Sequence, residues 1–301
     1  MVAITNTERF YDLVPKGAHV ERLGTGFTFT EGPVWNSGGK YLLFSDMPGD
    51  VRRRWDAKDG IREVKRPSNK GNGMTYEVGG DLLVCEHVTS SLVRERADGT
   101  RQVLASHFEG KELNSPNDVV VASDKSIYFS DPTYGRMPVF GLERKQDLSF
   151  QGVYRVQPNG ERLQLLVDDF EQPNGLCFSP DESRLFINDS PRALIRVFKR
   201  SADGTIDKGS VFFDRIGSGG LEEGVPDGMK CDEHGNIYVT GPGGIWVIGP
   251  DASLLGRIDV PEVVGNLNWG GDGWKTLFIC ASTSLYKIDL TVSGNKLAYM
   301  R

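Results

Sequence analysis

Six polar residues recur along the chain, each with a side-chain oxygen and each directly before a short apolar segment. Successive members are 41, 45, 57, 53 and 39 residues apart, and in order they are Glu31, Asn72, Asn117, Asn174, Asp227 and Asn266. Brought together, two carboxylates and several carboxamide oxygens would make the all-oxygen cage that Ca²⁺, Mg²⁺ or Mn²⁺ prefers. Carboxylates crowded in a narrow space repel each other unless a cation neutralises them. The pattern therefore predicts a divalent metal site.

Each of these residues begins the same local pattern of an apolar strand, a Gly/Asp turn and a second apolar strand. Examples are NGMTYEVGGDLLVCE from Asn72 and NDVVVASDKSIYFSD from Asn117. Further strand-like segments follow most of these hairpins, and the apolar residues alternate with a period near two rather than 3.6. Repeats of this length, with four strands each, are typical of propeller blades. We predict an all-β, six-bladed β-propeller with four antiparallel strands per blade.

One domain accounts for residues 18–301, with residues 1–17 as an N-terminal tail. A ring of blades must close so that no sheet edge stays open. The strand-like segment at residues 19–23 stands before the first blade and has no hairpin partner beside it in the sequence. It is therefore predicted to supply the outer strand of the last blade.

The repeat also predicts where the polar side chains meet. The first strand of each blade lines the central channel, so the six oxygen-bearing residues should converge at one mouth of it. The second strand runs antiparallel and returns to that mouth 14 or 15 residues later, at Asp46, Glu86, Asp131, Asp189, Gly241 and Ala281. Up to six carboxylates are thus expected there. In any single blade, however, Asn, Asp and Gly are also ordinary turn residues.

Composition and charge exclude several classes of partner. The 301 residues carry 35 Lys and Arg against 41 Asp and Glu, a net charge of −6 that disfavours nucleic-acid binding. No apolar run approaches the ~18 residues that a membrane span needs, and the N-terminus lacks signal-peptide features. The four cysteines lie too far apart for a zinc knuckle or a disulfide framework. We expect buried free thiols in a reduced, cytoplasmic protein.

Six motifs in order carry a resemblance to a known family. They are TEGPVW (30–35), CEH (85–87), LNSPNDVVV (113–121), DPTYG (131–135), QPNGLCFSPDES (172–183) and VPDGMKCDEHGNIYV (225–239). From about Thr30 to its end the chain resembles the SMP-30/gluconolactonase/LRE-like family, and within it the bacterial and fungal gluconolactonase branch. The resemblance implies a six-bladed propeller lactonase.

It also implies a metal site formed by four side chains, here Glu31, Asn117, Asn174 and Asp227. They would hold one divalent cation, with Ca²⁺ ranked first and Mg²⁺, Mn²⁺, Zn²⁺ or Fe²⁺ compatible with oxygen ligands. Asp227 is also implied as the proton acceptor and donor. The animal members carry an Arg two residues before the second ligand, where this chain has Ser115, so their substrate preference does not carry over.

The leading hypothesis is hydrolysis of a small sugar-derived lactone to its hydroxy acid. The metal would polarise the carbonyl oxygen, and either Asp227 or a metal-bound hydroxide would serve as the base. One alternative is a metal-dependent phosphotriesterase or aryl esterase on the same scaffold. Another is a non-catalytic, ligand-binding propeller, since a fold alone does not prove activity. No G-x-S-x-G or H-E-x-x-H motif offers a different route to hydrolysis.

Further residues are predicted to contact the substrate, and several have a second interpretation. Asn72 and Asn266 are either substrate contacts or supports for the metal ligands. His87 either binds substrate hydroxyls and relays a proton or is structural. Asp131 of the DPTYG motif is either a wall residue or one that orients Asn117 or a loop amide. The full predicted set is Asn72, His87, Ser115, Asp131, Tyr134 and Asn266.

The insertion at residues 135–152 makes the third repeat the longest, and it either covers the mouth or is a solvated loop. The expected partner is a small-molecule lactone, with no nucleic acid and no membrane. The sequence does not fix the oligomeric state.

Overall fold

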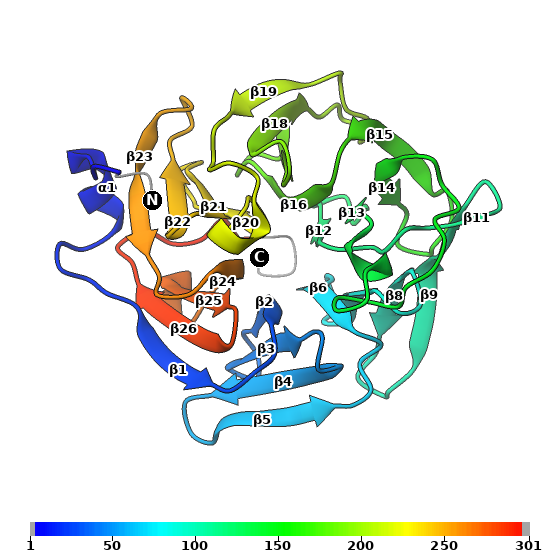
Figure 1. Ribbon diagram of the computed structural model, residues 1–301, viewed down its shortest axis with the longest axis horizontal. Coiled ribbons are helices and arrows are strands. Elements are labelled where there is room, and N and C mark those ends of the chain that lie inside the picture. The colour runs from blue at the N-terminus through cyan, green and yellow to red at the C-terminus, as the bar shows by residue number, and fades with distance from the viewer. Residues whose placement is uncertain (1–3, 297–301) are drawn as a thin grey trace.

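The computed structural model describes residues 4–296, which form six four-stranded antiparallel sheets around a central channel (Figure 1). Each sheet is a blade, and in five of the six the strands follow one another in sequence from the channel outwards. The first three blades are β2 (Thr30–Asn36), β3 (Tyr41–Asp46), β4 (Val51–Asp56) and β5 (Gly60–Lys65); β6 (Gly71–Tyr76), β7 (Leu82–Glu86), β8 (Ser91–Glu95) and β9 (Arg101–Ala105); and β12 (Val119–Val121), β13 (Ile127–Asp131), β14 (Gln151–Val156) and β15 (Gln164–Phe170).

The remaining blades repeat this arrangement, and the six together confirm the predicted propeller. They are β16 (Pro173–Phe178), β17 (Arg184–Asp189), β18 (Leu194–Lys199) and β19 (Ser210–Phe213); β20 (Met229–Cys231), β21 (Ile237–Gly241), β22 (Gly244–Ile248) and β23 (Leu254–Asp259); and β24 (Val264–Gly270), β25 (Thr276–Ala281) and β26 (Ser284–Asp289) with β1 (Glu21–Thr25). Smaller elements are the hairpin β10 (His107–Phe108) and β11 (Lys111–Glu112) and the 3₁₀ turns η1 (Tyr134–Arg136), η2 (Leu221–Glu223) and η3 (Asp272–Trp274).

The N-terminal strand closes the ring as predicted. Strand β1 pairs antiparallel with β26, from Glu21 opposite Lys287 to Thr25 opposite Ser284, and so becomes the outer strand of the last blade. The observed strand lies two residues later than the predicted segment at 19–23. Residues 297–301, the last part of the predicted domain 18–301, lie outside the described residues, as do residues 1–3 of the predicted tail.

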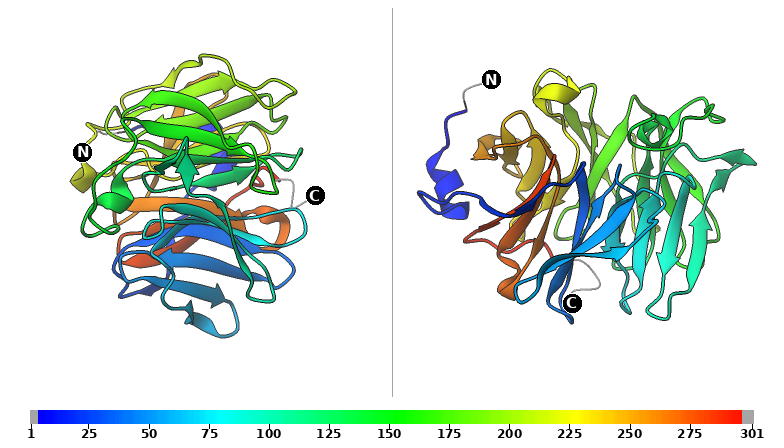
Figure 2. Two further views of the ribbon diagram at one scale, coloured as in Figure 1. Left: turned by 90° about the vertical axis from the view of Figure 1, so that its right-hand side faces the viewer. Right: turned by 60° about the horizontal axis from the view of Figure 1, so that its bottom comes forward.

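The rest of the tail contains a short helix, α1 (Glu8–Leu13), on the outside of the ring next to β23 (Figures 1 and 2). Thr7 caps this helix, because its hydroxyl oxygen accepts a hydrogen bond from the Phe10 amide at 3.2 Å. Phe10 and Leu13 are buried against the fifth and sixth blades. No helix among residues 4–296 is long and apolar enough to cross a membrane.

A recurring irregularity turns the six oxygen-bearing residues into the channel. In four blades the register of the first strand pair shifts at these residues, for example between Glu31 and Val34 and between Pro173 and Leu176. In the third and fifth blades the first strand begins only after them, at Val119 and at Met229. Such a bulge leaves a residue outside the ladder and bends the strand, which re-aims its side chain.

Glycines that follow these residues let neighbouring blades approach closely. A side chain on Gly175 would place its Cβ 2.1 Å from the carbonyl oxygen of Asp227, and one on Gly73 would lie 2.4 Å from that of Asn117. Instead, the Gly175 amide donates to the Asp227 carbonyl at 3.0 Å, and the Gly73 amide donates to the Asn117 carbonyl at 2.8 Å. These bonds tie the second blade to the third and the fourth blade to the fifth.

The core lies between adjacent blades, where apolar side chains on facing sheets interlock. Between the third and fourth blades, for instance, Tyr128 packs edge-to-face on Phe178 with ring centroids 5.1 Å apart. All four cysteines are buried and free, as predicted: Cys85, Cys177, Cys231 and Cys280.

Candidate metal and active site

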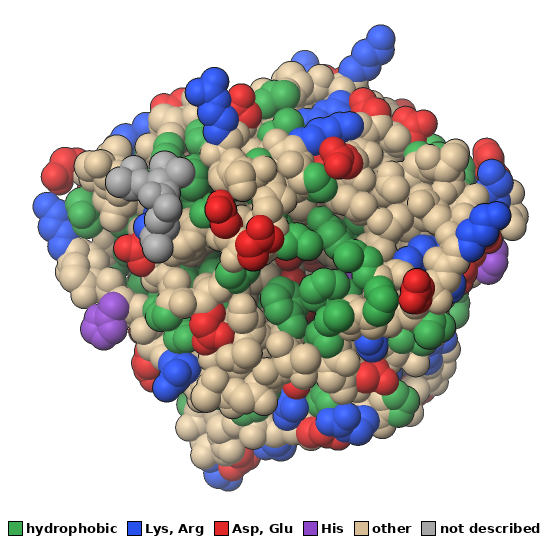
Figure 3. Space-filling view, viewed as in Figure 1, with side chains coloured by type: hydrophobic (Ala, Val, Ile, Leu, Met, Phe, Trp, Pro, Cys, Tyr) green, Lys and Arg blue, Asp and Glu red, His purple; other side chains and the backbone are tan. Residues whose placement is uncertain are grey.

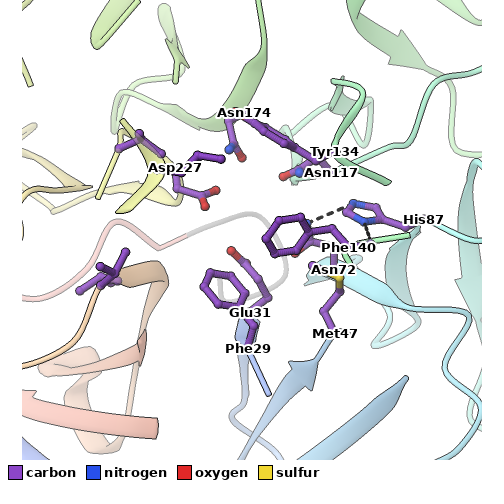
Figure 4. A pocket seen from close by; sticks show the side chains of 14 residues that line it. Phe29, Glu31, Met47, Asn72, His87, Asn117, Tyr134, Phe140, Asn174 and Asp227 are labelled. Atoms are coloured by element: carbon purple, nitrogen blue, oxygen red, sulfur yellow. Dashed lines mark hydrogen bonds between the residues drawn. The ribbon is translucent and has the colours of Figure 1, made fainter. Parts of the chain in front are cut away.

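A pocket of about 620 Å³, counting space open to solvent, lies at one mouth of the channel. Seven of the predicted site residues line it, five of them from the repeated series, and they point inwards from different blades (Figure 4). These seven are Glu31, Asn72, His87, Asn117, Tyr134, Asn174 and Asp227.

The two carboxylates of the pocket are held by different means. Glu31 is 2% exposed, and its Oε2 accepts hydrogen bonds from the Gly32 amide at 2.8 Å and from Asn266 Nδ2 at 3.0 Å. Asp227 is fixed through its backbone, since its amide donates to Thr240 Oγ1 at 2.8 Å and its carbonyl accepts from Asn188 Nδ2 at 2.7 Å. The Glu31 carboxylate and the Asp227 backbone are therefore positioned before any ligand arrives.

Burial makes it costly for these carboxylates to carry charge. Desolvation raises the pKa of Glu31 from an ordinary 4.5 to about 7, although hydrogen bonds from Asn266 and Gly32 oppose the rise. Desolvation, followed by the nearby charge of Glu31, raises the pKa of Asp227 well above its usual range. A cation between the two groups would remove this cost.

The carboxamides supply oxygens that have no protein partner. Asn174 Nδ2 donates to Ser190 Oγ at 3.1 Å, and the Ser190 hydroxyl donates to the Pro226 carbonyl at 2.6 Å. This leaves Asn174 Oδ1 buried without a hydrogen-bond partner, and Asn72 Oδ1 is in the same state. A buried acceptor left unpaired costs about 1–3 kcal/mol, so these atoms are expected to serve a ligand.

The four side chains implied as metal ligands fit a divalent cation. Glu31 and Asp227 supply carboxylates, Asn174 supplies an unpaired oxygen, and Asn117 lines the same pocket at 4% exposure. Residues 4–296 contain no group of three or more His, Cys, Asp or Glu side chains that could hold a metal ion. An ion here would thus depend on carboxamide oxygens, which suits hard cations.

Three predicted site residues lie outside the pocket lining and act as supports. Asn266 holds Glu31, as described above. Asp131 accepts hydrogen bonds from the backbone amides of Asn114 at 2.8 Å and Ser115 at 2.7 Å. The Ser115 hydroxyl donates to the Pro132 carbonyl at 2.5 Å and accepts from the Gly135 amide at 2.9 Å. Their side chains orient the chain around the pocket instead of facing its interior.

The expectation that up to six carboxylates meet at the mouth is wrong, because the four at the ends of the second strands bind back to the protein. Asp46 accepts from the Thr28 amide at 2.8 Å, and Asp189 accepts from the Glu171 amide at 2.9 Å. Asp46, Asp131 and Asp189 share this arrangement. Each accepts hydrogen bonds from backbone amides that lie two or three residues before the proposed metal ligand of the same blade. Glu86 is paired with Arg101. Among the described lining residues, only Glu31 and Asp227 are carboxylates.

Apolar residues outside the predicted set also line the pocket. Figure 3 shows hydrophobic side chains gathered around the hollow at the centre of this face. Three of them stand two positions before a member of the repeated series, so alternation along the strand could have identified them. The full set is Phe29, Met47, Phe140, Leu221, Val225, Val263 and Val264.

The fold and this site define a six-bladed propeller with a candidate metal centre at its axis, and comparison with known proteins places it in a family. The model of the SMP-30/Gluconolactonase/LRE-like region matches residues 29–283, and the chain belongs to this family.

Similar proteins include a gluconolactonase of Zymomonas mobilis, which is 32% identical and aligns over 91% of this chain and 82% of its own length. A pentonolactonase of Haloferax volcanii is 27% identical over 83% of this chain and 80% of its own. The solved structure of a gluconolactonase from Xanthomonas campestris is 30% identical, with a TM-score of 0.85 over 95% of this chain and 93% of that one.

The buried carboxylates predict how the stability of the metal-free protein depends on pH. The pKa of Glu31 is higher in the folded chain than in the unfolded chain. The stability that this difference contributes to the fold is therefore fully present below about pH 4.5 and is lost as pH rises through about 7. In the unaltered chain we expect the free energy of unfolding to fall by roughly 3 kcal/mol over this range because of Glu31, and in Glu31→Gln we expect this fall to be absent. Urea unfolding of both chains in chelator from pH 5 to 8 measures the difference, and parallel curves would contradict the assignment.

Proposed function

We propose that this chain hydrolyses a small sugar lactone to its hydroxy acid with the help of one divalent cation. The observation that carries the proposal is the meeting of two buried carboxylates with an unpaired carboxamide oxygen in one pocket. The family and the gluconolactonase and pentonolactonase among the similar proteins support the choice of substrate.

In this proposal Glu31, Asn117, Asn174 and Asp227 hold the cation, for which Ca²⁺ is the first choice. When bound, it would polarise the lactone carbonyl and stabilise the negative charge that develops on its oxygen. The side chains contribute orientation: Asn266 holds Glu31, and Ser190 fixes the amide of Asn174.

The proton transfers fall to Asp227. Its carboxylate accepts a proton from the attacking water as the water oxygen bonds to the carbonyl carbon. When the bond between this carbon and the ring oxygen breaks, the same proton passes to the ring oxygen, which gives the hydroxyl of the product. Burial raises the pKa of Tyr134, so its phenol stays protonated and can donate a hydrogen bond to the substrate.

A direct test is to assay the purified protein, with a divalent ion present, on aldonolactones, an aryl ester and a phosphotriester. The proposal expects turnover of the lactones to exceed that of the other two classes. A preference for the aryl ester or phosphotriester would make the chain a different hydrolase on the same scaffold.

The charge of the pocket predicts a preference for uncharged lactones. Among the described lining residues there is no Lys or Arg. Two cations near His87 are engaged, since Lys70 Nζ donates to the Val139 carbonyl at 2.9 Å and Arg144 donates to the His87 carbonyl at 3.2 Å. We expect kcat/KM for gluconolactone to exceed that for its 6-phosphate at least about tenfold, because the phosphate loses hydration without a partner. Equal values for the two substrates would contradict this prediction.

A further inference from the structure

Asn72 presents a buried oxygen to the pocket with a defined orientation. The residue is 3% exposed, its Nδ2 lies 3.2 Å from His87 Nε2, and its Oδ1 has no hydrogen-bond partner. We propose that Asn72 determines substrate specificity by accepting a hydrogen bond from a hydroxyl of the lactone, and that the loop at residues 135–152 sets this orientation through His87. The inference rests on the proposed function and deepens it.

The first step is the tautomer of His87. Its Nδ1 lies 2.8 Å from the backbone carbonyl oxygen of Phe140. A carbonyl can only accept, so Nδ1 must carry the proton. Burial also lowers the pKa of His87 to about 4, which leaves the ring neutral at physiological pH. The other nitrogen, Nε2, therefore carries a lone pair and no proton.

The second step is the orientation of the Asn72 amide. A bare Nε2 needs a donor, and of the two ends of a carboxamide only the NH₂ group donates. Asn72 Nδ2 must therefore face His87, and Oδ1 must face the pocket. The reverse arrangement would set two acceptors against each other inside a buried site. Figure 4 shows this relay, with His87 bonded on one side to Asn72 and on the other to the Phe140 backbone.

The third step is that the loop carrying Phe140 is itself fastened. Lys70 Nζ donates to the carbonyls of Val139 and Gly141, at 2.9 and 3.2 Å. At Gly135, an added Cβ would lie 2.7 Å from His87 Cγ, so the loop packs directly on the imidazole. The phenyl ring of Phe140 meets Phe29 edge-to-face at 5.8 Å. The carbonyl that selects the tautomer is thus held in place.

A fixed acceptor recognises a donor, and the donor that a neutral sugar lactone offers is a hydroxyl group. A site built to pair with a hydroxyl discriminates strongly against an analogue that lacks it, because the buried oxygen is then left unpaired. The chemical class that suits Asn72 is therefore a hydroxylated lactone, in contrast to an unsubstituted ring of the same size.

The test compares glucono-δ-lactone with δ-valerolactone, which has the same ring without hydroxyls. We expect Asn72→Ala to lower the ratio of kcat/KM for glucono-δ-lactone to kcat/KM for δ-valerolactone about tenfold, mainly because kcat/KM for the hydroxylated substrate falls. We expect His87→Phe to lower the ratio less, since the amide can then turn. The double variant should be no worse than Asn72→Ala, because His87 acts through Asn72.

Two other results would overturn the inference. An unchanged ratio in Asn72→Ala would show that Asn72 does not read the hydroxyl. A large rise in the Ca²⁺ concentration needed to stabilise this variant against heat would make Asn72 a metal ligand instead. If the unaltered protein hydrolyses neither lactone, the proposed function fails first, and that outcome is distinct from an unchanged ratio.

The tautomer can be measured without any substrate. The ¹⁵N chemical shifts of the histidine side chains distinguish a protonated Nδ1 from a protonated Nε2, and His87→Phe assigns the signal among four histidines. We expect a protonated Nδ1 and a bare Nε2 at neutral pH. A protonated Nε2 would reverse the Asn72 amide and overturn the relay, even if the activity ratio changed.

Discussion

Replacing Asp227 with asparagine is expected to lower kcat on a sugar lactone about 1000-fold while the propeller stays folded. The substitution keeps the size of the side chain and removes both its charge and its capacity to take a proton. Its backbone contacts to Thr240, Asn188 and Gly175 do not involve the carboxylate, so the inner strand should keep its place. The loss should therefore fall on turnover rather than on the fold.

The measurement needs kcat at a divalent-ion concentration that saturates the variant, because loss of a carboxylate also weakens metal binding. Asp118→Asn is the matched control. This carboxylate is buried in the same channel, pairs with Lys230 at 3.3 Å and does not line the pocket. The Asp118→Asn protein should keep kcat within about tenfold of the value for the unaltered protein, even if the variant is less stable. If the saturated Asp227→Asn chain kept more than a tenth of normal turnover, Asp227 would not be the base.

The fold was predictable from the sequence because the blade repeat appears in the order of residues. The turn residues, the alternating apolar residues and the oxygen-bearing side chains recur together once in each blade. Closure by β1 followed from the single unpaired strand before the first blade. The observed strand, Glu21–Thr25, begins two residues later than predicted and contains a bulge between Arg22 and Gly24 that alternation alone does not reveal.

The site was predictable where it depended on the repeat, and less so elsewhere. Glu31 and Asp227 converge because equivalent strand positions must meet at the axis. The direction of a side chain at a strand end depends on nearby backbone amides, and these turned Asp46 and Asp189 away from the pocket. The contact between His87 and Phe140 joins a blade to a non-repeating insertion, so no periodic signal could have indicated it.

Removing divalent ions is expected to abolish lactone hydrolysis, with a loss of at least about 100-fold that one added ion restores. Glu31 and Asp227 are both buried, and burial raises the pKa of each carboxyl group; the nearby charge of Glu31 raises that of Asp227 further. Without a cation, one or both should be protonated at neutral pH, and Asp227 could then not accept a proton. The ion should also stabilise the fold by about 4 kcal/mol at 1,000 times its dissociation constant.

The measurement uses chelator-treated protein, with activity and melting temperature recorded as Ca²⁺, Mg²⁺, Mn²⁺, Zn²⁺ and Fe²⁺ are restored one at a time. Glu31→Gln is the matched variant, because an amide oxygen can still accept from Gly32 and Asn266 while the charge is lost. It should need at least about tenfold more ion for half-maximal activity. Full activity in chelator would exclude the metal from the reaction. Stabilisation by an ion without turnover of any lactone or ester would instead make the chain a ligand-binding propeller.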